Sequence, residues 1–118
     1  MEKKRFDHRK LMELATLIFQ KCGYSQQDSE TIADVLVTAD LYGITSHGLQ
    51  RLNLYVYGLE IGRIKLHAKP TIIRETLVSA LLDADDAMGQ ISGVQSMKLA
   101  IEKAKHSGIG FVVTKNNT

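Results

Sequence analysis

The stretch Leu77–Thr114, LVSALLDADDAMGQISGVQSMKLAIEKAKHSGIGFVVT, contains a strand pattern, a helix pattern and a second strand pattern in succession. We expect strands over 77–83 and 109–114, because both runs are dominated by apolar residues. Between them, 90–106 has the apolar spacing of an amphipathic helix. Its expected inward-facing residues are Ile91, Val94, Met97 and Ile101. Strand, helix and strand in this order predict a crossover unit.

The residues before and between these elements extend the sheet. The run 71–75, TIIRE, is rich in β-branched residues and predicts a further strand. The run 83–89, DADDAMG, predicts an acidic turn in which one Asp caps the next helix; binding of a cation is the alternative. A sheet of so few strands has long unpaired edges, which complete proteins usually cover. We therefore expect the chain to be part of a longer domain.

The first part of the sequence predicts three helices that pack as a small bundle. Asp7 and Ser25 are expected N-caps, and Gly23 and Gly43 are expected to end the first two helices. A third helix is expected to begin near Ser46. The apolar stripes are Leu11, Leu14, Ala15, Leu17 and Ile18 in the first helix, Ile32, Val35, Leu36 and Ala39 in the second, and Leu49, Leu52, Val56 and Leu59 in the third.

Composition and charge limit the class of protein. The 118 residues are 44% hydrophobic and 24% charged, with a net charge of +2, which excludes a disordered or fibrous chain. No apolar run approaches the ~20 residues that span a bilayer, and no signal peptide is recognisable. The single cysteine fits a cytoplasmic protein. Acidic residues interrupt the basic ones, so a nucleic-acid partner is not expected.

These patterns together predict an α+β or α/β fold. A helical region over 1–66 precedes the beginning of an α/β domain over 67–118, with a mixed sheet and a crossover helix. No pair of histidines has helical metal-ligand spacing and none lies beside the cysteine, so we expect no metal site.

The run 43–52, GITSHGLQRL, is the strongest candidate for chemistry. Two glycines and two hydroxyl groups surround His47, which is expected in the first turn of the third helix. Backbone N–H groups at a helix start favour anions, so a neutral imidazole able to accept a proton is expected there. Arg51 follows four residues later and could hold a carboxylate. The alternative is that Ser46 merely caps the helix and His47 is exposed without a role.

The run Ala39–Gly48, ADLYGITSHG, followed by Arg51-Leu52 and Tyr55, resembles the second-type malate/L-lactate dehydrogenase family. Asp83, Asp85, Gly89 and Gln90 match a second pattern of that family. A third match is the helix from Met97 to Ala104 that leads into Gly108-Ile109-Gly110. The matches follow the order of the family's N-terminal region.

The resemblance implies an NAD(P)-dependent oxidoreductase with a fold that is not Rossmann. Its reaction would interconvert a small 2-hydroxy acid and a 2-keto acid, with His47 as the catalytic residue and Ser46 and Arg51 binding the substrate. The resemblance also implies a homodimer. Family members continue with an Asn-x-x-His-[Phe/Tyr]-Gly run, and most segments that bind NAD or NADP lie further on. We therefore expect a fragment that is inactive alone.

A second hypothesis needs no catalysis. The exposed strand edges also fit a helical interaction module without enzymatic activity, which persists by self-association or by pairing with another chain.

Overall fold

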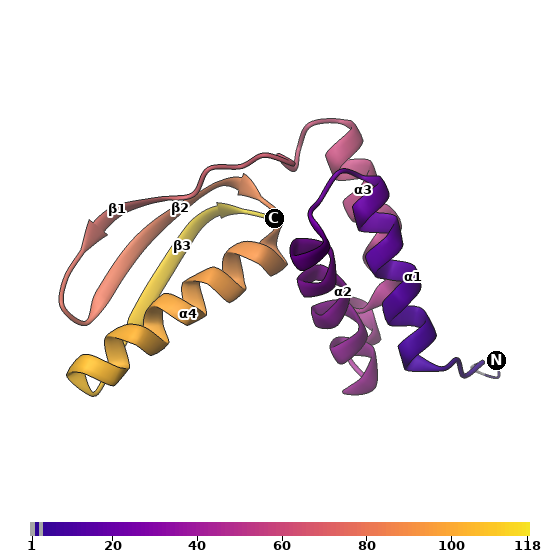
Figure 1. Ribbon diagram of the computed structural model, residues 1–118, viewed down its shortest axis with the longest axis horizontal. Helices are drawn as coiled ribbons and strands as arrows, with labels where there is room; N and C mark the ends of the chain where they lie inside the picture. Colours follow the sequence, from indigo (N-terminus) through magenta and orange to yellow (C-terminus); the bar gives the residue numbers. More distant parts are fainter. Residues whose placement is uncertain (1, 3) are drawn as a thin grey trace. The chain divides into compact units, whose positions relative to one another are not determined.

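The computed structural model describes residue 2 and residues 4–118. Backbone contacts divide the chain into two units, Met1–Glu60 and Ile61–Thr118. The first unit is helical, and the second holds a three-stranded sheet with one helix (Figure 1). The domain boundary predicted between residues 66 and 67 stays a prediction. Within the described residues, no helix combines the length and the apolar character needed to cross a membrane.

The first helix, α1 (His8–Lys21), begins and ends where the sequence predicts. The Asp7 carboxylate accepts the N–H of Arg9 at 2.8 Å, so this side chain satisfies one of the free N–H groups at the helix start. Gly23 lies just past the end with a φ of +110°, a conformation that side chains other than glycine rarely adopt. Both predictions are confirmed.

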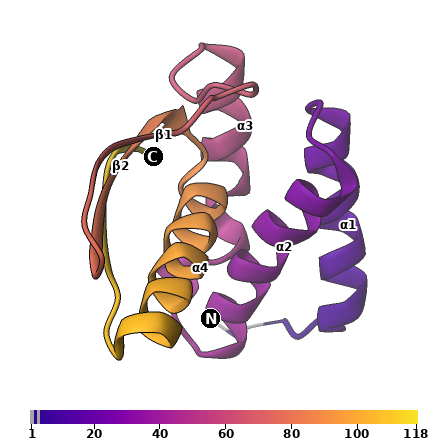
Figure 2. The ribbon, with the colours of Figure 1, turned by 60° about the vertical axis from the view of Figure 1, so that its left-hand side comes forward.

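The second helix, α2 (Gln26–Leu41), packs against α1 (Figure 2). Its predicted N-cap is confirmed, because Ser25 Oγ accepts the N–H of Asp28 at 3.1 Å. The expected apolar stripes are partly wrong: Leu14, Leu17 and Val35 are exposed. Of the predicted residues, Ala15, Ile32 and Leu36 are buried as expected, and the two helices also bury Phe19, Ser29, Ala33 and Val37.

The third helix differs from its prediction at its start. Two single 3₁₀ turns, η1 (Thr45–His47) and η2 (Leu49–Arg51), precede the α-helix α3 (Leu52–Glu60). Gly48 separates the two turns with extended backbone, at φ −91° and ψ −153°. The predicted helix start near Ser46 is therefore wrong, since the extended residue interrupts the helical hydrogen bonds.

The second unit confirms the mixed sheet and its crossover helix. The strands β1 (Thr71–Glu75), β2 (Ser79–Ala87) and β3 (Phe111–Asn117) lie in that order across the sheet (Figure 1). β1 pairs with β2 antiparallel, and β2 pairs with β3 parallel. The helix α4 (Gly89–Ser107) connects the two parallel strands, as the strand–helix–strand pattern predicts.

The face of α4 that is buried differs from its prediction. Ser92 and Ser96 are buried, whereas Met97 is 61% exposed and Ile101 is also exposed. Ser96 Oγ lies 2.6 Å from Thr114 Oγ1 on β3, so a hydroxyl pair joins the helix to the sheet. Small side chains allow the helix and the strands to approach closely; of the four predicted residues, Ile91 and Val94 are half-buried, and Met97 and Ile101 are left exposed.

The acidic run is part of a strand rather than a turn. β2 continues through Asp83 to Ala87, although Asp85 and Asp86 take left-handed conformations at φ 54° and 57°, because Ala87 pairs with Asn117 of β3. Aspartate tolerates this conformation better than most residues, so an irregular strand can pass through it. The N–H of Asp85 donates to the Asp83 carboxylate, and this bond holds the pKa of Asp83 below its usual range.

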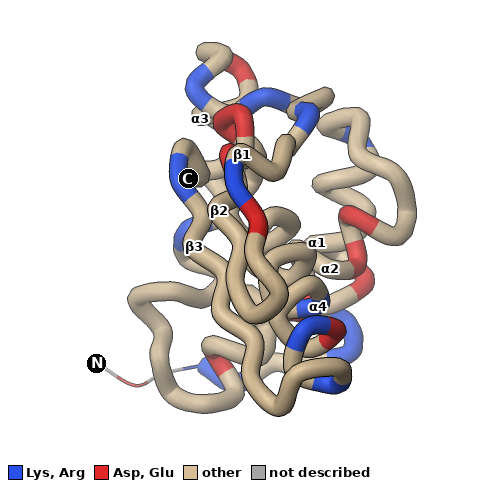
Figure 3. The backbone as a smooth tube through the Cα atoms, turned by 90° about the vertical axis from the view of Figure 1, so that its left-hand side faces the viewer, with Lys and Arg blue, Asp and Glu red and all other residues tan. Residues whose placement is uncertain are grey.

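Charged side chains on the sheet unit are paired across elements. Basic and acidic segments adjoin on β1 (Figure 3), where Glu75 Oε1 accepts from Lys103 Nζ of α4 at 2.7 Å. The same ammonium group donates to the carbonyl oxygen of Thr76 at 2.8 Å. Lys65 Nζ and Asp85 Oδ1 lie 2.5 Å apart. These pairs connect α4 and the segment before β1 to the sheet.

The free energy of unfolding of the helical unit is expected to depend on pH in the alkaline range, because Tyr24 is buried. Burial raises the pKa of its hydroxyl to about 12, and Cys22 and Asp28 add to the shift. In the unfolded chain the hydroxyl ionises near its ordinary value of about 10, so the unfolded state gains stability first as the pH rises. We expect the free energy of unfolding to fall by about 1 kcal/mol between about pH 9 and pH 11.

Urea unfolding at both pH values measures this loss. Tyr24→Phe is expected to remove it, whereas Tyr57→Phe, which changes an exposed tyrosine, is expected to keep it. An equal loss in the Tyr24→Phe variant would show that another group titrates.

Candidate active site

The candidate site is built on the loop between α2 and α3. The end of α2 is closed by hydrogen bonds from the N–H of Gly43 to the Asp40 carbonyl and from the N–H of Ile44 to the Ala39 carbonyl. Gly43 takes a φ of +78° to make this closure possible. The chain then turns directly into η1 and η2, which carry the three residues predicted to form the site.

Ser46, His47 and Arg51 are brought together on this loop. Ser46 Oγ lies 2.9 Å from His47 Nδ1, and the Nε–H group of Arg51 donates to the Ser46 carbonyl at 2.5 Å. Ser46 and His47 are exposed and Arg51 is half-buried. Ser46 therefore contacts both the imidazole and the guanidinium, through its side chain and its backbone respectively.

The imidazole of His47 does not lie at the start of an α-helix, contrary to the prediction. His47 lies in η1 and precedes the extended Gly48, so it is not in the first turn of an α-helix. The expected influence of a helix start on the imidazole is therefore absent at this position. What the structure provides instead is the Ser46 hydroxyl beside Nδ1.

The contacts leave specific atoms free to meet a ligand. Because Nδ1 of His47 faces Ser46, Nε2 is the ring nitrogen available for exchange of a proton. Because Nε of Arg51 is engaged, the two terminal nitrogens of the guanidinium are available to a carboxylate. The loop thus presents a titratable base and a planar cation within four residues of each other.

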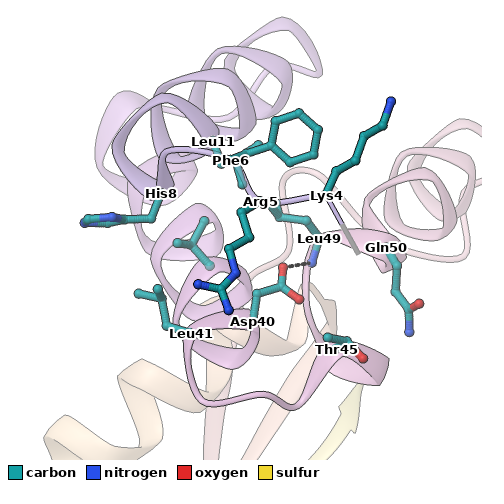
Figure 4. A pocket seen from close by; sticks show the side chains of 11 residues that line it. Lys4, Arg5, Phe6, His8, Leu11, Asp40, Leu41, Thr45, Leu49 and Gln50 are labelled. Atoms are coloured by element: carbon teal, nitrogen blue, oxygen red, sulfur yellow. Dashed lines mark hydrogen bonds between the residues drawn. The ribbon is translucent and has the colours of Figure 1, made fainter. Parts of the chain in front are cut away.

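A cleft of about 870 Å³ lies beside the same loop within the helical unit (Figure 4). Basic side chains from the N-terminal segment, apolar side chains from the helices and the carboxylate of Asp40 line it. The Asp40 carboxylate hydrogen-bonds the backbone of Leu49 inside this cleft, and the side chain of Arg5 points toward it (Figure 4).

Asp40, in the last turn of α2, contacts the loop, and the sequence analysis assigned it no role. Its Oδ2 accepts the N–H of Leu49, nine residues later, at 2.8 Å. The available signal in the sequence is an acidic residue in the last turn of a helix, where the negative helix end disfavours a carboxylate.

The two glycines at the start of α4 do not form an open phosphate-binding loop. The run Gly89–Gly93 opens α4 with two glycines, but a Cβ at Gly89 would meet the backbone carbonyl of Thr118, so chain already fills that space. Gly93 has no neighbour that requires a glycine. Nor do three or more His, Cys, Asp or Glu side chains of the described part of the chain gather to hold a metal ion.

Comparison with known proteins places the chain among dehydrogenases. The profile of the family described as malate/L-lactate dehydrogenase matches residues 6–118. Malate dehydrogenase of Pyrococcus horikoshii is 45% identical over 108 residues, which are 92% of this chain and 30% of that protein. L-Sulfolactate dehydrogenase of Methanocaldococcus jannaschii is 40% identical over 99 residues, 84% of this chain and 29% of the relative.

Comparison with solved structures gives the same family. The structure of the Pyrococcus horikoshii malate dehydrogenase superposes with a TM-score of 0.92 and 42% identity, over 99% of this chain and 36% of that one. The chain spans about 30% of the length of the curated relatives it matches, in their N-terminal portion. Similarity of sequence and of fold over nearly all its residues shows that this chain belongs to the malate/L-lactate dehydrogenase family.

Proposed function

We propose that the chain is the N-terminal part of an oxidoreductase that interconverts a small 2-hydroxy acid and the corresponding 2-keto acid. The observation that carries the proposal is the hydrogen-bonded group of Ser46, His47 and Arg51 on one loop. It occurs in a chain whose relatives are named malate and sulfolactate dehydrogenases.

In this proposal His47 is the catalytic residue. Nε2 takes the proton of the substrate hydroxyl during oxidation and returns it to the ketone oxygen during reduction. Ser46 accepts a hydrogen bond from Nδ1–H, which keeps Nε2 unprotonated before oxidation and stabilises the imidazolium formed afterwards.

Arg51 and Ser46 bind the substrate. A guanidinium can meet both oxygens of a carboxylate with its terminal N–H groups. Engagement of its Nε by the Ser46 carbonyl fixes the plane in which those groups point. The substrate carbon that carries the hydroxyl would then lie beside the imidazole.

Arg51→Lys tests the planar contact. Lysine keeps the charge but loses both the two-point contact and the bond to Ser46. We expect kcat/KM for the hydroxy acid to fall by about tenfold to a hundredfold, mainly through a higher KM. Steady-state kinetics at varied substrate concentration measure this, with Arg63→Lys, an exposed arginine outside the loop, as the matched control. A change of less than twofold would argue against carboxylate binding by Arg51.

We further propose a nicotinamide cofactor, NAD or NADP, as the hydride carrier, held mostly by segments outside this chain. The proposed assembly is a homodimer, as the family resemblance implies. A cytoplasmic location is supported by the single, unpaired cysteine. Nucleic-acid and membrane partners are not proposed.

The proposed reaction is tested by comparing two proteins. The 118-residue chain alone is expected to give no oxidation of NADH or NADPH with oxaloacetate or pyruvate. A chimera in which residues 6–118 replace the matching segment of the Pyrococcus horikoshii enzyme is expected to reduce oxaloacetate. A folded but inactive chimera would count against the proposal, and turnover by the chain alone that His47→Ala abolishes would correct the expectation of inactivity.

A non-enzymatic module that self-associates is the second candidate. It is favoured by β3, which lies at the edge of the sheet with Phe111 62% exposed and Val113 also exposed. Light scattering tests this candidate, because a clean monomer at high protein concentration would argue against such a module.

A further inference from the structure

The last turn of α2 holds a carboxylate where the helix alone does not favour one. Asp40 lies at the C-terminal, negative end of α2. Its side chain reaches across the loop, and Oδ2 accepts the N–H of Leu49 at 2.8 Å. Leu49 begins the helical stretch η2–α3, whose first N–H groups carry partial positive charge. The carboxylate therefore caps one helical segment from the end of another.

Gly48 packs closely against the carboxylate of Asp40. A Cβ built on Gly48 would overlap the carboxylate carbon and both oxygens of Asp40. The backbone of Gly48, at φ −91°, is open to any residue, so space rather than conformation requires glycine here. The side chain of Asp40 occupies the place that a side chain at position 48 would take.

These two contacts are the support of the loop next to His47. Thr45, Leu49 and Gln50 line the cleft of about 870 Å³ (Figure 4). On the C-terminal side of His47, the carboxylate therefore holds the backbone at Gly48 and Leu49, together with the hydrogen bond from the N–H of Gly48 to the Thr45 carbonyl at 3.2 Å. Arg51 follows two residues later, and its N–H donates to the Gly48 carbonyl at 3.0 Å.

We propose that Asp40 is a positioning residue, which sets the orientation of the His47 ring relative to Arg51 by holding Gly48 and Leu49. The proposal rests on the proposed role of His47 in proton exchange. In this proposal Asp40 acts through the backbone of Leu49, whose N–H its Oδ2 accepts, and not by contact with the substrate.

The test follows the loop directly by NMR of the 118-residue chain. Asp40→Ala is expected to speed hydrogen exchange of the Leu49 amide by about tenfold, the loss of one hydrogen bond to a charged group. It is also expected to shift the ring ¹⁵N resonances of His47. Asp40→Asn keeps an oxygen acceptor at the same distance, so both signals are expected to return toward those of the unaltered chain. Asp34→Ala, which removes an exposed acid from the same helix, is the control.

Two further variants separate geometry from charge and from unfolding. Asp40→Glu keeps the charge but moves the carboxylate by one methylene, and it is expected to shift the His47 resonances while residues 61–118 keep theirs. Gly48→Ala is also expected to shift the His47 resonances. The shift is expected to be smaller when Gly48→Ala is combined with Asp40→Ala, because the second substitution removes the carboxylate that the new methyl group would meet. Unchanged His47 resonances in Asp40→Ala or Asp40→Glu, or no restoration by Asp40→Asn, would overturn the proposal.

The outcome is distinguishable from failure of the proposed function. In the chimera, Asp40→Ala is expected to lower kcat more than it raises KM, with recovery in Asp40→Asn. If His47→Ala leaves turnover intact while the Asp40 variants still move the His47 ring, the proposed chemistry fails and the contact remains. If His47→Ala abolishes turnover while the Asp40 variants leave kcat unchanged, the positioning role fails alone.

Discussion

Replacement of His47 by alanine is expected to lower kcat of the chimera by about two to four orders of magnitude, the usual contribution of a positioned acid–base group. Without the imidazole, the proton of the substrate hydroxyl must pass to water, which is a poorer acceptor and is not held in place. KM is expected to change little, because Arg51 still binds the carboxylate. Stopped-flow and steady-state measurement of NADH formation from malate gives both constants.

A loss of activity in this variant can be attributed to catalysis, because His47 is exposed and its side chain contributes little to the stability of the fold. We expect the melting temperature of the variant to match that of the parent chimera. His106→Ala removes an exposed histidine from α4 and is the matched control, with kcat expected to stay within twofold. A similar small effect of His47→Ala would remove His47 from the reaction, whatever its contact with Ser46.

Replacement of Phe19 by alanine is expected to have the largest effect on stability. The Phe19 side chain is 0% exposed, and its ring packs edge-on against Tyr24 with centroids 6.4 Å apart. Truncation of a fully buried phenylalanine costs about 3–5 kcal/mol, because apolar surface is lost and a cavity remains. A helical unit of this size has little stability to spare, so we expect α1 and α2 to be largely unfolded at 25 °C.

Circular dichroism and urea unfolding measure the loss. Leu17→Ala truncates an exposed residue of the same helix, and we expect it to change the free energy of unfolding by less than about 0.5 kcal/mol. Phe19→Leu is expected to lie between the two. Equal effects of Phe19→Ala and Leu17→Ala would mean that the apolar stripe, including Leu17, is the buried face after all.

Local signals in the sequence were sufficient where one residue or its neighbours decide the structure. Asp7 and Ser25 cap helices because their oxygens reach N–H groups two or three residues away. Gly23 and Gly43 end helices because glycine adopts positive φ without a steric penalty. The strand–helix–strand pattern also predicted the parallel pairing of β2 with β3.

The same local signals gave wrong predictions where contacts with a distant part of the chain determine the structure. The acidic run predicted a turn, but pairing of Ala87 with Asn117 carries the strand through two left-handed aspartates. Met97 and Ile101 have the apolar character of inward-facing residues, but Ser92 and Ser96 are the residues small enough for close contact with the sheet. Hydrophobic spacing shows that a helix has an apolar side, and packing selects which side is covered.

The sequence by itself determined the class of elements, most of their ends and the short run that holds Ser46, His47 and Arg51. These depend on interactions between residues a few positions apart, which composition and spacing record. Tertiary structure alone decided the break at Gly48, the contact of Ser46 with both the imidazole and Arg51, and the hydrogen bond from Leu49 to Asp40. That bond joins residues nine positions apart, at the junction of two helical segments, so its partner is fixed by the closure of the loop and not by any local preference.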